Sequence, residues 1–131
     1  MKGLDTNVLV RYLTADDAKQ TAAAERLLAQ AAEAGERLFV PVLVLYELTW
    51  VLSRSYDQSR AEIVAALDGI LETELFRVEN DSIVRSALEA YRGRADFADY
   101  LIGEICRQAG CEKCVTFDRG LKGVAGFALL L

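Results

Sequence analysis

The segment Lys2-Gly3-Leu4-Asp5-Thr6-Asn7-Val8-Leu9-Val10-Arg11-Tyr12-Leu13 decides the fold class. Its opening residues are a short apolar start that ends in Asp5, which predicts a strand over Lys2–Asp5. The run Asn7–Leu13 is rich in large apolar residues and predicts a buried helix. A strand followed at once by a helix is the repeating unit of α/β proteins with parallel sheets.

The same alternation continues to the end of the chain. Helix-forming residues or helical apolar spacing predict helices over Ala15–Ala34, Val42–Leu52, Ser59–Leu71, Ser82–Tyr91 and Phe97–Ala109. Short apolar runs predict strands over Arg37–Val40, Leu75–Val78, Lys113–Phe117 and Phe127–Leu131. We therefore expect a single α/β domain over residues 1–131 with a mostly parallel sheet.

Several helix ends carry recognisable signals. Thr14, with Asp17 three residues later, is expected to cap the long second helix, and Gly35 is expected to end it. Asp96 is expected to cap the helix that begins at Phe97. The helix over Val42–Leu52 is apolar on nearly every side, so we expect it to be central.

The composition limits the possible functions. The chain has 131 residues, a net charge of −5 and a pI of about 4.8. Nucleic-acid binders usually carry a basic footprint, but a cation neutralises acids that share a metal site. No run approaches the roughly 18 apolar residues of a membrane span, and a strand that begins almost at Met1 leaves no room for a signal peptide. We expect a cytoplasmic protein without membrane contact.

Histidine is absent, and the three cysteines are Cys106, Cys111 and Cys114. A zinc site needs about four ligands, so the Cys111-x-x-Cys114 spacing is interpreted as buried or half-buried free thiols. The lack of His removes Ser–His and Cys–His nucleophilic mechanisms. Acid–base chemistry then falls to carboxylates, Lys, Tyr or metal-bound water.

Four carboxylates adjoin apolar segments: Asp5, Glu47, Asp99 and Asp118. Asp5 and Asp118 follow predicted strands, where sites form in parallel α/β sheets. Taken singly, Asp5, Asp99 and Asp118 can be caps or turn residues, and Glu47 can lie on a solvent stripe or pair with an Arg. Taken together they predict one acidic cleft. Converging carboxylates need a compensating cation, so the cleft is a candidate metal site.

These residues resemble the PIN-domain ribonucleases, especially the VapC-type toxins of bacterial toxin–antitoxin pairs. The resemblance rests on Asp5–Leu13, Leu45-Tyr46-Glu47-Leu48, Asp96-Phe97-Ala98-Asp99-Tyr100-Leu101-Ile102 and Thr116-Phe117-Asp118. It spans nearly the whole chain. It implies a three-layer α/β/α PIN-like fold with a mostly parallel sheet and a metal-dependent endoribonuclease.

The resemblance also implies roles for the acids. Asp5 and Asp99 would be the main ligands of Mg²⁺ or Mn²⁺, and Glu47 and Asp118 would complete the pocket directly or through water. Asp96 would either face the pocket or only cap its helix. Such ions prefer oxygen ligands, and one or two of them can stabilise the charge of an in-line phosphoryl transition state.

Supporting residues follow from the same resemblance. Minor contacts around the metal would come from Thr6, Asn7 and Thr116. One departure is Tyr100, which stands where the family often has a small residue. RNA also needs positive charge outside the acidic pocket. The candidates for phosphate contact are Arg11, Arg92, Arg94, Arg119 and Lys122, and an ordinary surface role is an equal alternative for each.

By resemblance the protein would be the toxin of a pair, held inactive by a VapB-like antitoxin and assembled as a homodimer. Two other functions stay open at this point. One is a non-catalytic α/β binding module with a structural acid cluster. The other is a phosphoryl-transfer or receiver-type protein with Asp5 as acceptor, although Asn7 stands where dehalogenase-like phosphatases need a second Asp.

Overall fold

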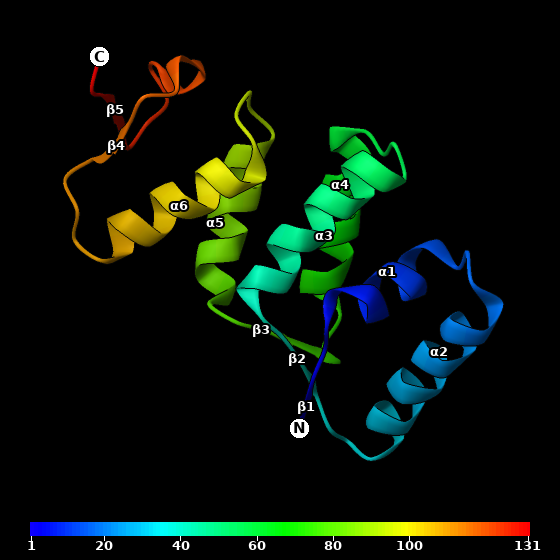
Figure 1. Cartoon of the computed structure of the whole chain (residues 1–131). Coiled ribbons are helices and arrows are strands. Elements are labelled where there is room, and N and C mark those ends of the chain that lie inside the picture. The colour runs from blue at the N-terminus through cyan, green and yellow to red at the C-terminus, as the bar shows by residue number, and fades with distance from the viewer. The chain divides into compact units, whose positions relative to one another are not determined.

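A computed structural model describes the whole chain, residues 1–131 (Figure 1). The helices are α1 (Thr6–Thr14), α2 (Ala18–Glu33), α3 (Val42–Ser55), α4 (Arg60–Glu72), α5 (Asp81–Tyr91), α6 (Phe97–Gln108) and the 3₁₀ turn η1 (Arg119–Leu121). The strands are β1 (Lys2–Gly3), β2 (Leu38–Val40), β3 (Phe76–Val78), β4 (Cys114–Thr116) and β5 (Phe127–Leu129). The chain divides into two compact units, Met1–Asp81 and Ser82–Leu131.

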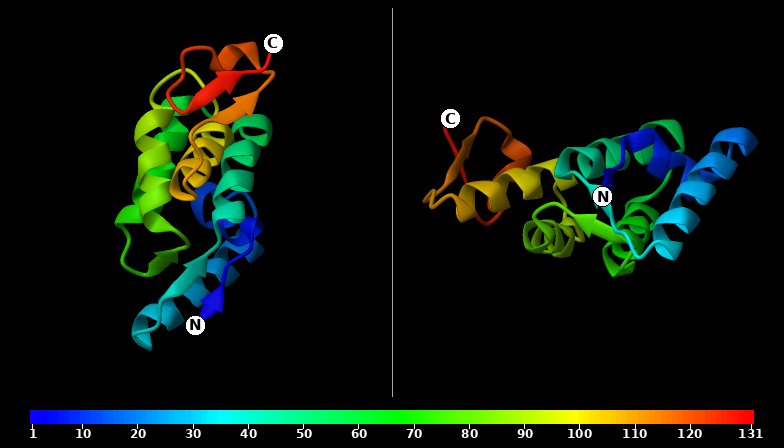
Figure 2. Two further views of the ribbon diagram at one scale, coloured as in Figure 1. Left: turned by 90° about the vertical axis from the view of Figure 1, so that its left-hand side faces the viewer. Right: turned by 90° about the horizontal axis from the view of Figure 1, so that it is seen from below.

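The first unit holds a three-stranded sheet in the order β1-β2-β3. Both strand pairs are parallel, with Lys2 opposite Leu38 and Leu38 opposite Phe76, and Figure 2 shows the strands side by side. Parallel neighbours need a crossover between them, which α1 and α2 supply before β2, and α3 and α4 supply before β3. The buried residues of the unit are mainly Leu and Val from these strands and from α1, α3 and α4.

The second unit holds α5, α6 and a parallel pair of short strands, β4 and β5, with η1 in the connection between them. Tyr91 and Phe97 pack edge-to-face, with ring centroids 5.5 Å apart. Tyr91 is only 7% exposed and is a core residue. The two ring positions fix the end of α5 against the start of α6, where Asp96 and Asp99 lie.

The expected α/β class is confirmed. Strands alternate with helices, and every strand pair is parallel. Gly35 directly follows the C-cap of α2 with φ +67°, a conformation that Gly adopts without penalty. No helix in the structure is both long enough and apolar enough to cross a membrane.

The start of the second helix differs from the sequence prediction. The helix begins at Ala18 rather than Ala15, and its N-cap is Asp17, whose Oδ1 accepts from the Gln20 amide at 2.9 Å. Thr14 instead ends α1, and its hydroxyl donates to the Val10 carbonyl at 2.7 Å. Ala15 has φ +53°, so the helix is interrupted there.

The α3 helix is also less central than predicted. Val44, Leu45, Leu48 and Leu52 form its buried side. Leu43, Tyr46 and Trp50 are exposed on the other side, and the Arg54 guanidinium lies 5.6 Å from the centroid of the Trp50 ring. The helix therefore has one buried face and one exposed face. The sequence did not distinguish them because both faces carry apolar residues.

Candidate functional site

Asp5 and Asp118 occupy equivalent positions in the two units. Each stands two residues after a parallel strand, β1 or β4, and each caps the helical turn that follows. Asp5 Oδ1 accepts from the Thr6 amide at 2.8 Å, and Asp118 Oδ1 accepts from the Gly120 amide at 2.8 Å. Capping thus fixes both carboxylates at the carboxyl ends of strands.

Thr6 joins Asp5 to Glu47 within the first unit. Its amide binds Asp5, and its hydroxyl donates to Glu47 Oε1 at 3.1 Å. Thr6 is 5% exposed, whereas Asp5 and Glu47 are exposed within the unit. The buried Thr6 hydroxyl therefore orients the Glu47 carboxylate, which is open to solvent. Glu47 lies on the face of α3 that also carries Tyr46 and Trp50.

Within the second unit, the charges of Asp96 and Asp118 act on Asp99. Asp99 is half-buried in the first turn of α6, and its Oδ2 accepts from the Asp96 amide at 3.2 Å. Burial raises the pKa of the Asp99 carboxyl above its ordinary value, and the negative charges of Asp96 and Asp118 raise it further. Asp96 is the N-cap residue of α6, as predicted. A bound cation would relieve this concentration of negative charge.

The acids thus form two groups, Asp5 with Glu47, and Asp99 with Asp96 and Asp118. In neither unit do three or more His, Cys, Asp or Glu side chains come close enough together to hold a metal ion by themselves. The chemistry of the donors nonetheless fits a hard divalent ion. All of them are carboxylate oxygens, which Mg²⁺ and Mn²⁺ prefer to nitrogen or sulfur.

Thr116 supports the turn that carries Asp118, and its predicted contact around the metal stays a prediction. Its Oγ1 accepts from the Asp118 amide at 3.0 Å, which holds the turn after β4. Asn7 is exposed in the first turn of α1. The three cysteines are free, with Cys111 exposed and Cys106 and Cys114 half-buried. A hydrogen bond to Cys114 and burial both raise the pKa of the Cys106 thiol.

Arg11 belongs to a network that the sequence analysis did not foresee. Its guanidinium donates to Gln20 at 2.7 Å, to Asp16 at 3.1 Å and to the Tyr56 hydroxyl at 3.0 Å. Tyr56 donates in turn to Asp16 at 2.6 Å. The network ties α1 to the start of α2 and to the end of α3. Nothing local in the sequence marks Tyr56, because it lies 45 residues from Arg11.

The other basic candidates differ in their surroundings. Arg92 pairs with Glu89 at 3.3 Å, and Arg94 donates to the Lys122 carbonyl. Arg119 and Lys122 are exposed and form no ion pair. Because Arg119 directly follows Asp118, these two cations stand beside an acid of the second unit. Their contact with RNA stays a prediction.

The fold and these acids define an α/β protein with carboxylates fixed at the carboxyl ends of parallel strands. A family model described as PIN domain matches residues 3–127. A curated VapC ribonuclease from Aquifex aeolicus (strain VF5) is 34% identical over 123 residues, which cover 93% of this chain and 90% of that protein. The chain belongs to the PIN-domain family, and the resemblance inferred from its motifs is confirmed.

Proposed function

We propose that this protein is a Mg²⁺- or Mn²⁺-dependent endoribonuclease and the toxin of a toxin–antitoxin pair. The observation that carries the proposal is the agreement of two independent findings. Asp5 and Asp118, two of the four acids that the motifs marked, are fixed by caps after parallel strands, and a relative aligned over nearly the whole chain is a VapC ribonuclease. Residues 1–131 would act as a single PIN-like nuclease domain.

Asp5 and Asp99 are proposed as the main metal ligands, with Glu47 and Asp118 completing the acidic pocket directly or through water. A divalent ion held there would supply positive charge to stabilise a phosphodiester transition state. Asp96 stands at the N-cap of α6, and its backbone amide donates to Asp99 Oδ2; its carboxylate is proposed either to cap the helix or to face the metal. The raised pKa of Asp99 supports its place as a ligand, since a cation would favour its ionised form.

Other residues are proposed to orient the acids or to attract the RNA. Thr6 holds the Glu47 carboxylate through its hydroxyl, and Thr116 holds the turn of Asp118 through its side chain. Arg119 and Lys122 are the strongest candidates for RNA phosphate contact, since both are exposed and neither pairs with an acid. An acidic protein needs such local positive charge to approach RNA.

The location, the antitoxin partner and the oligomeric state are proposed from the relative's name and from the proposed RNA substrate. We propose a cytoplasmic protein that acts on cellular RNA, is neutralised by a VapB-like antitoxin and assembles as a homodimer. Sedimentation of the purified protein would give its oligomeric state. Co-purification with the product of a small neighbouring gene would test the antitoxin.

An RNA-cleavage assay tests the function directly. Labelled tRNA, rRNA fragments and mRNA are incubated with the purified protein in Mn²⁺, in Mg²⁺ and in EDTA. The proposal expects internal cleavage with either metal and none in EDTA. Absence of cleavage on every RNA, together with absence of Mn²⁺ binding by calorimetry, would contradict it and would instead favour a non-catalytic binding module.

A further inference from the structure

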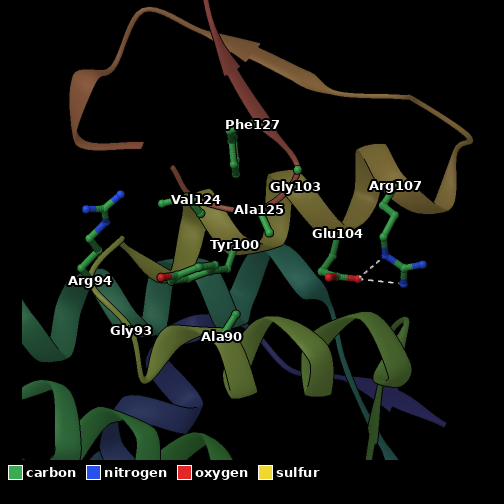
Figure 3. A pocket seen from close by; sticks show the side chains of 11 residues that line it. Ala90, Gly93, Arg94, Tyr100, Gly103, Glu104, Arg107, Val124, Ala125 and Phe127 are labelled. Carbon is green, nitrogen blue, oxygen red and sulfur yellow. Dashed lines mark hydrogen bonds and ion pairs between the residues drawn. The ribbon is translucent and has the colours of Figure 1, made fainter. Parts of the chain in front are cut away.

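The second unit contains a pocket of about 430 Å³ that is not lined by Asp96, Asp99 or Asp118. Its walls come from the end of α5, from one face of α6 and from the segment that enters β5 (Figure 3). Most of the wall is apolar, and it includes the rings of Tyr100 and Phe127. The volume lies within the roughly 300–1,000 Å³ of small-ligand sites.

Both aromatic side chains lie so close to a glycine that a larger residue at the glycine position would meet them. A Cβ atom built on Gly93 would lie 2.7 Å from the Tyr100 hydroxyl, and one on Gly103 would lie 3.0 Å from Phe127 Cε2. The Tyr100 hydroxyl also accepts from the Ala95 amide at 3.2 Å. The rings are therefore pre-positioned, so a flat ligand that stacks on them would not have to order them first.

One end of the pocket carries a hydrogen-bonding pair. Arg107 Nε and Nη2 donate to Glu104 Oε2 at 3.1 and 2.9 Å. No protein group donates to Glu104 Oε1, and the Glu104 side chain is only 23% exposed. Figure 3 shows this pair at the opposite end of the pocket from Arg94, with Tyr100 between them. The pocket thus offers a carboxylate acceptor beside a guanidinium donor.

This pattern matches the edge of one nucleobase best. Guanine presents two N–H donors, at N1 and N2, beside the O6 acceptor, which suits a carboxylate next to a guanidinium. Adenine presents an acceptor at N1, which the carboxylate would repel. Unpaired RNA bases are recognised by stacking on aromatic side chains and by hydrogen bonds to their Watson–Crick edges.

We propose that the pocket between Tyr100, Phe127 and the Glu104–Arg107 pair binds an unpaired nucleobase of the RNA substrate, with guanine preferred. The inference rests on the proposed ribonuclease function and adds a sequence preference to it. Tyr100 directly follows Asp99 in α6, so the pocket would hold a nucleotide close to the bond that is cut.

Nucleotide binding to the intact chain tests the pocket without relying on cleavage. GMP, IMP, AMP, CMP and UMP are titrated in EDTA and followed by amide NMR shifts. We expect GMP to bind about tenfold or more tightly than AMP, CMP or UMP. IMP, which lacks the N2 amine, is expected to fall between. Shifts should centre on Tyr100, Glu104 and Phe127.

Three variants and a matched control sharpen the test. Tyr100→Leu should weaken GMP binding roughly 5- to 100-fold through loss of stacking, and Tyr100→Phe should retain it. Glu104→Gln should remove the preference for GMP over AMP. Glu112→Gln changes an exposed acid away from the pocket and should leave every affinity unchanged.

The outcomes separate this inference from the proposed function. Equal affinity for all nucleotides, or shifts that avoid the pocket, overturns the guanine pocket even if the protein cleaves RNA with metal. A protein that binds GMP in the pocket but cleaves no RNA retains the pocket and overturns the nuclease. Wild-type GMP affinity in both Tyr100→Leu and Glu104→Gln also overturns the pocket.

Discussion

Thr6 donates its hydroxyl hydrogen bond to Glu47 Oε1 over 3.1 Å, and its amide binds Asp5 Oδ1. One buried residue at the start of α1 therefore orients an acid of α3 and is itself capped by the acid that follows β1. Residues that orient metal ligands in this way are often worth 10- to 100-fold in affinity or activity.

We predict that Thr6→Val lowers RNA cleavage and Mn²⁺ affinity by about 10- to 100-fold, because Glu47 loses its only hydrogen bond from this side chain. Thr6→Ser keeps the hydroxyl and should remain within a few-fold of wild type. Both variants keep the amide that Asp5 caps. Equal losses in the two variants would assign the effect to packing rather than to orientation.

Asp99→Asn is predicted to raise the melting temperature of the metal-free protein by a few degrees at neutral pH while abolishing cleavage. Burial and the charges of Asp96 and Asp118 raise the pKa of Asp99 in the folded state, so its ionised form costs stability. Removal of that charge removes the cost. Circular dichroism in EDTA provides the measurement.

The difference in melting temperature between Asp99→Asn and wild type should depend on pH in a definite direction. Because the folded-state pKa is above the unfolded value of about 3.9, the folded protein binds the extra proton more tightly, and wild-type stability recovers as pH falls. The gap between Asp99→Asn and wild type should therefore narrow between neutral pH and about pH 4. A gap that widens over this range would show that Asp99 is not destabilised by its neighbours.

For Asp16 we predict the opposite pH dependence of stability from that of Asp99. The hydrogen bond from Tyr56 lowers the pKa of Asp16 below its ordinary value, with further lowering by Thr14 and Arg11. Its stabilisation is present above the unfolded pKa and is lost as pH falls through the lower folded pKa. Tyr56→Phe should lower the melting temperature at neutral pH by a few degrees and by less below about pH 4.

Tyr56→Phe also tests whether Arg11 acts on RNA. If the Arg11 guanidinium mainly ties α1 to α2 and α3, both Tyr56→Phe and Arg11→Gln should reduce stability and leave the salt dependence of RNA binding unchanged. Arg119→Gln should instead weaken RNA binding and reduce its salt slope by about 1. If Arg11→Gln also reduces the salt slope of RNA binding, Arg11 would be a phosphate contact after all.

A capping variant separates stability from activity. Ser59 Oγ accepts from the Glu62 amide at 3.2 Å, and Glu62 Oε1 accepts from the Ser59 amide at 3.2 Å. Ser59→Ala should lower the free energy of unfolding by about 1 kcal/mol. At temperatures where it remains folded, its cleavage rate should equal that of wild type. Urea denaturation and single-turnover cleavage measure the two quantities.

Local signals in the sequence were enough for the element order, for the parallel strands and for the cap at Asp96, because each depends on neighbouring residues. The start of α2 was misplaced because Thr14 and Asp17 both have cap chemistry, and the positive φ of Ala15 leaves no mark in the sequence. The network of Arg11 with Tyr56 depends on a tertiary contact, so it could not be predicted from local sequence patterns.

Metal-dependent cleavage is proposed to need both Asp5 and Asp99. Mn²⁺ calorimetry and RNA cleavage on wild type, Asp5→Asn and Asp99→Asn test it most directly, with circular dichroism to show that each variant is folded. The account predicts that either substitution lowers cleavage at least about 100-fold and removes measurable Mn²⁺ binding. A folded variant that binds Mn²⁺ and cuts RNA as wild type does would contradict the account.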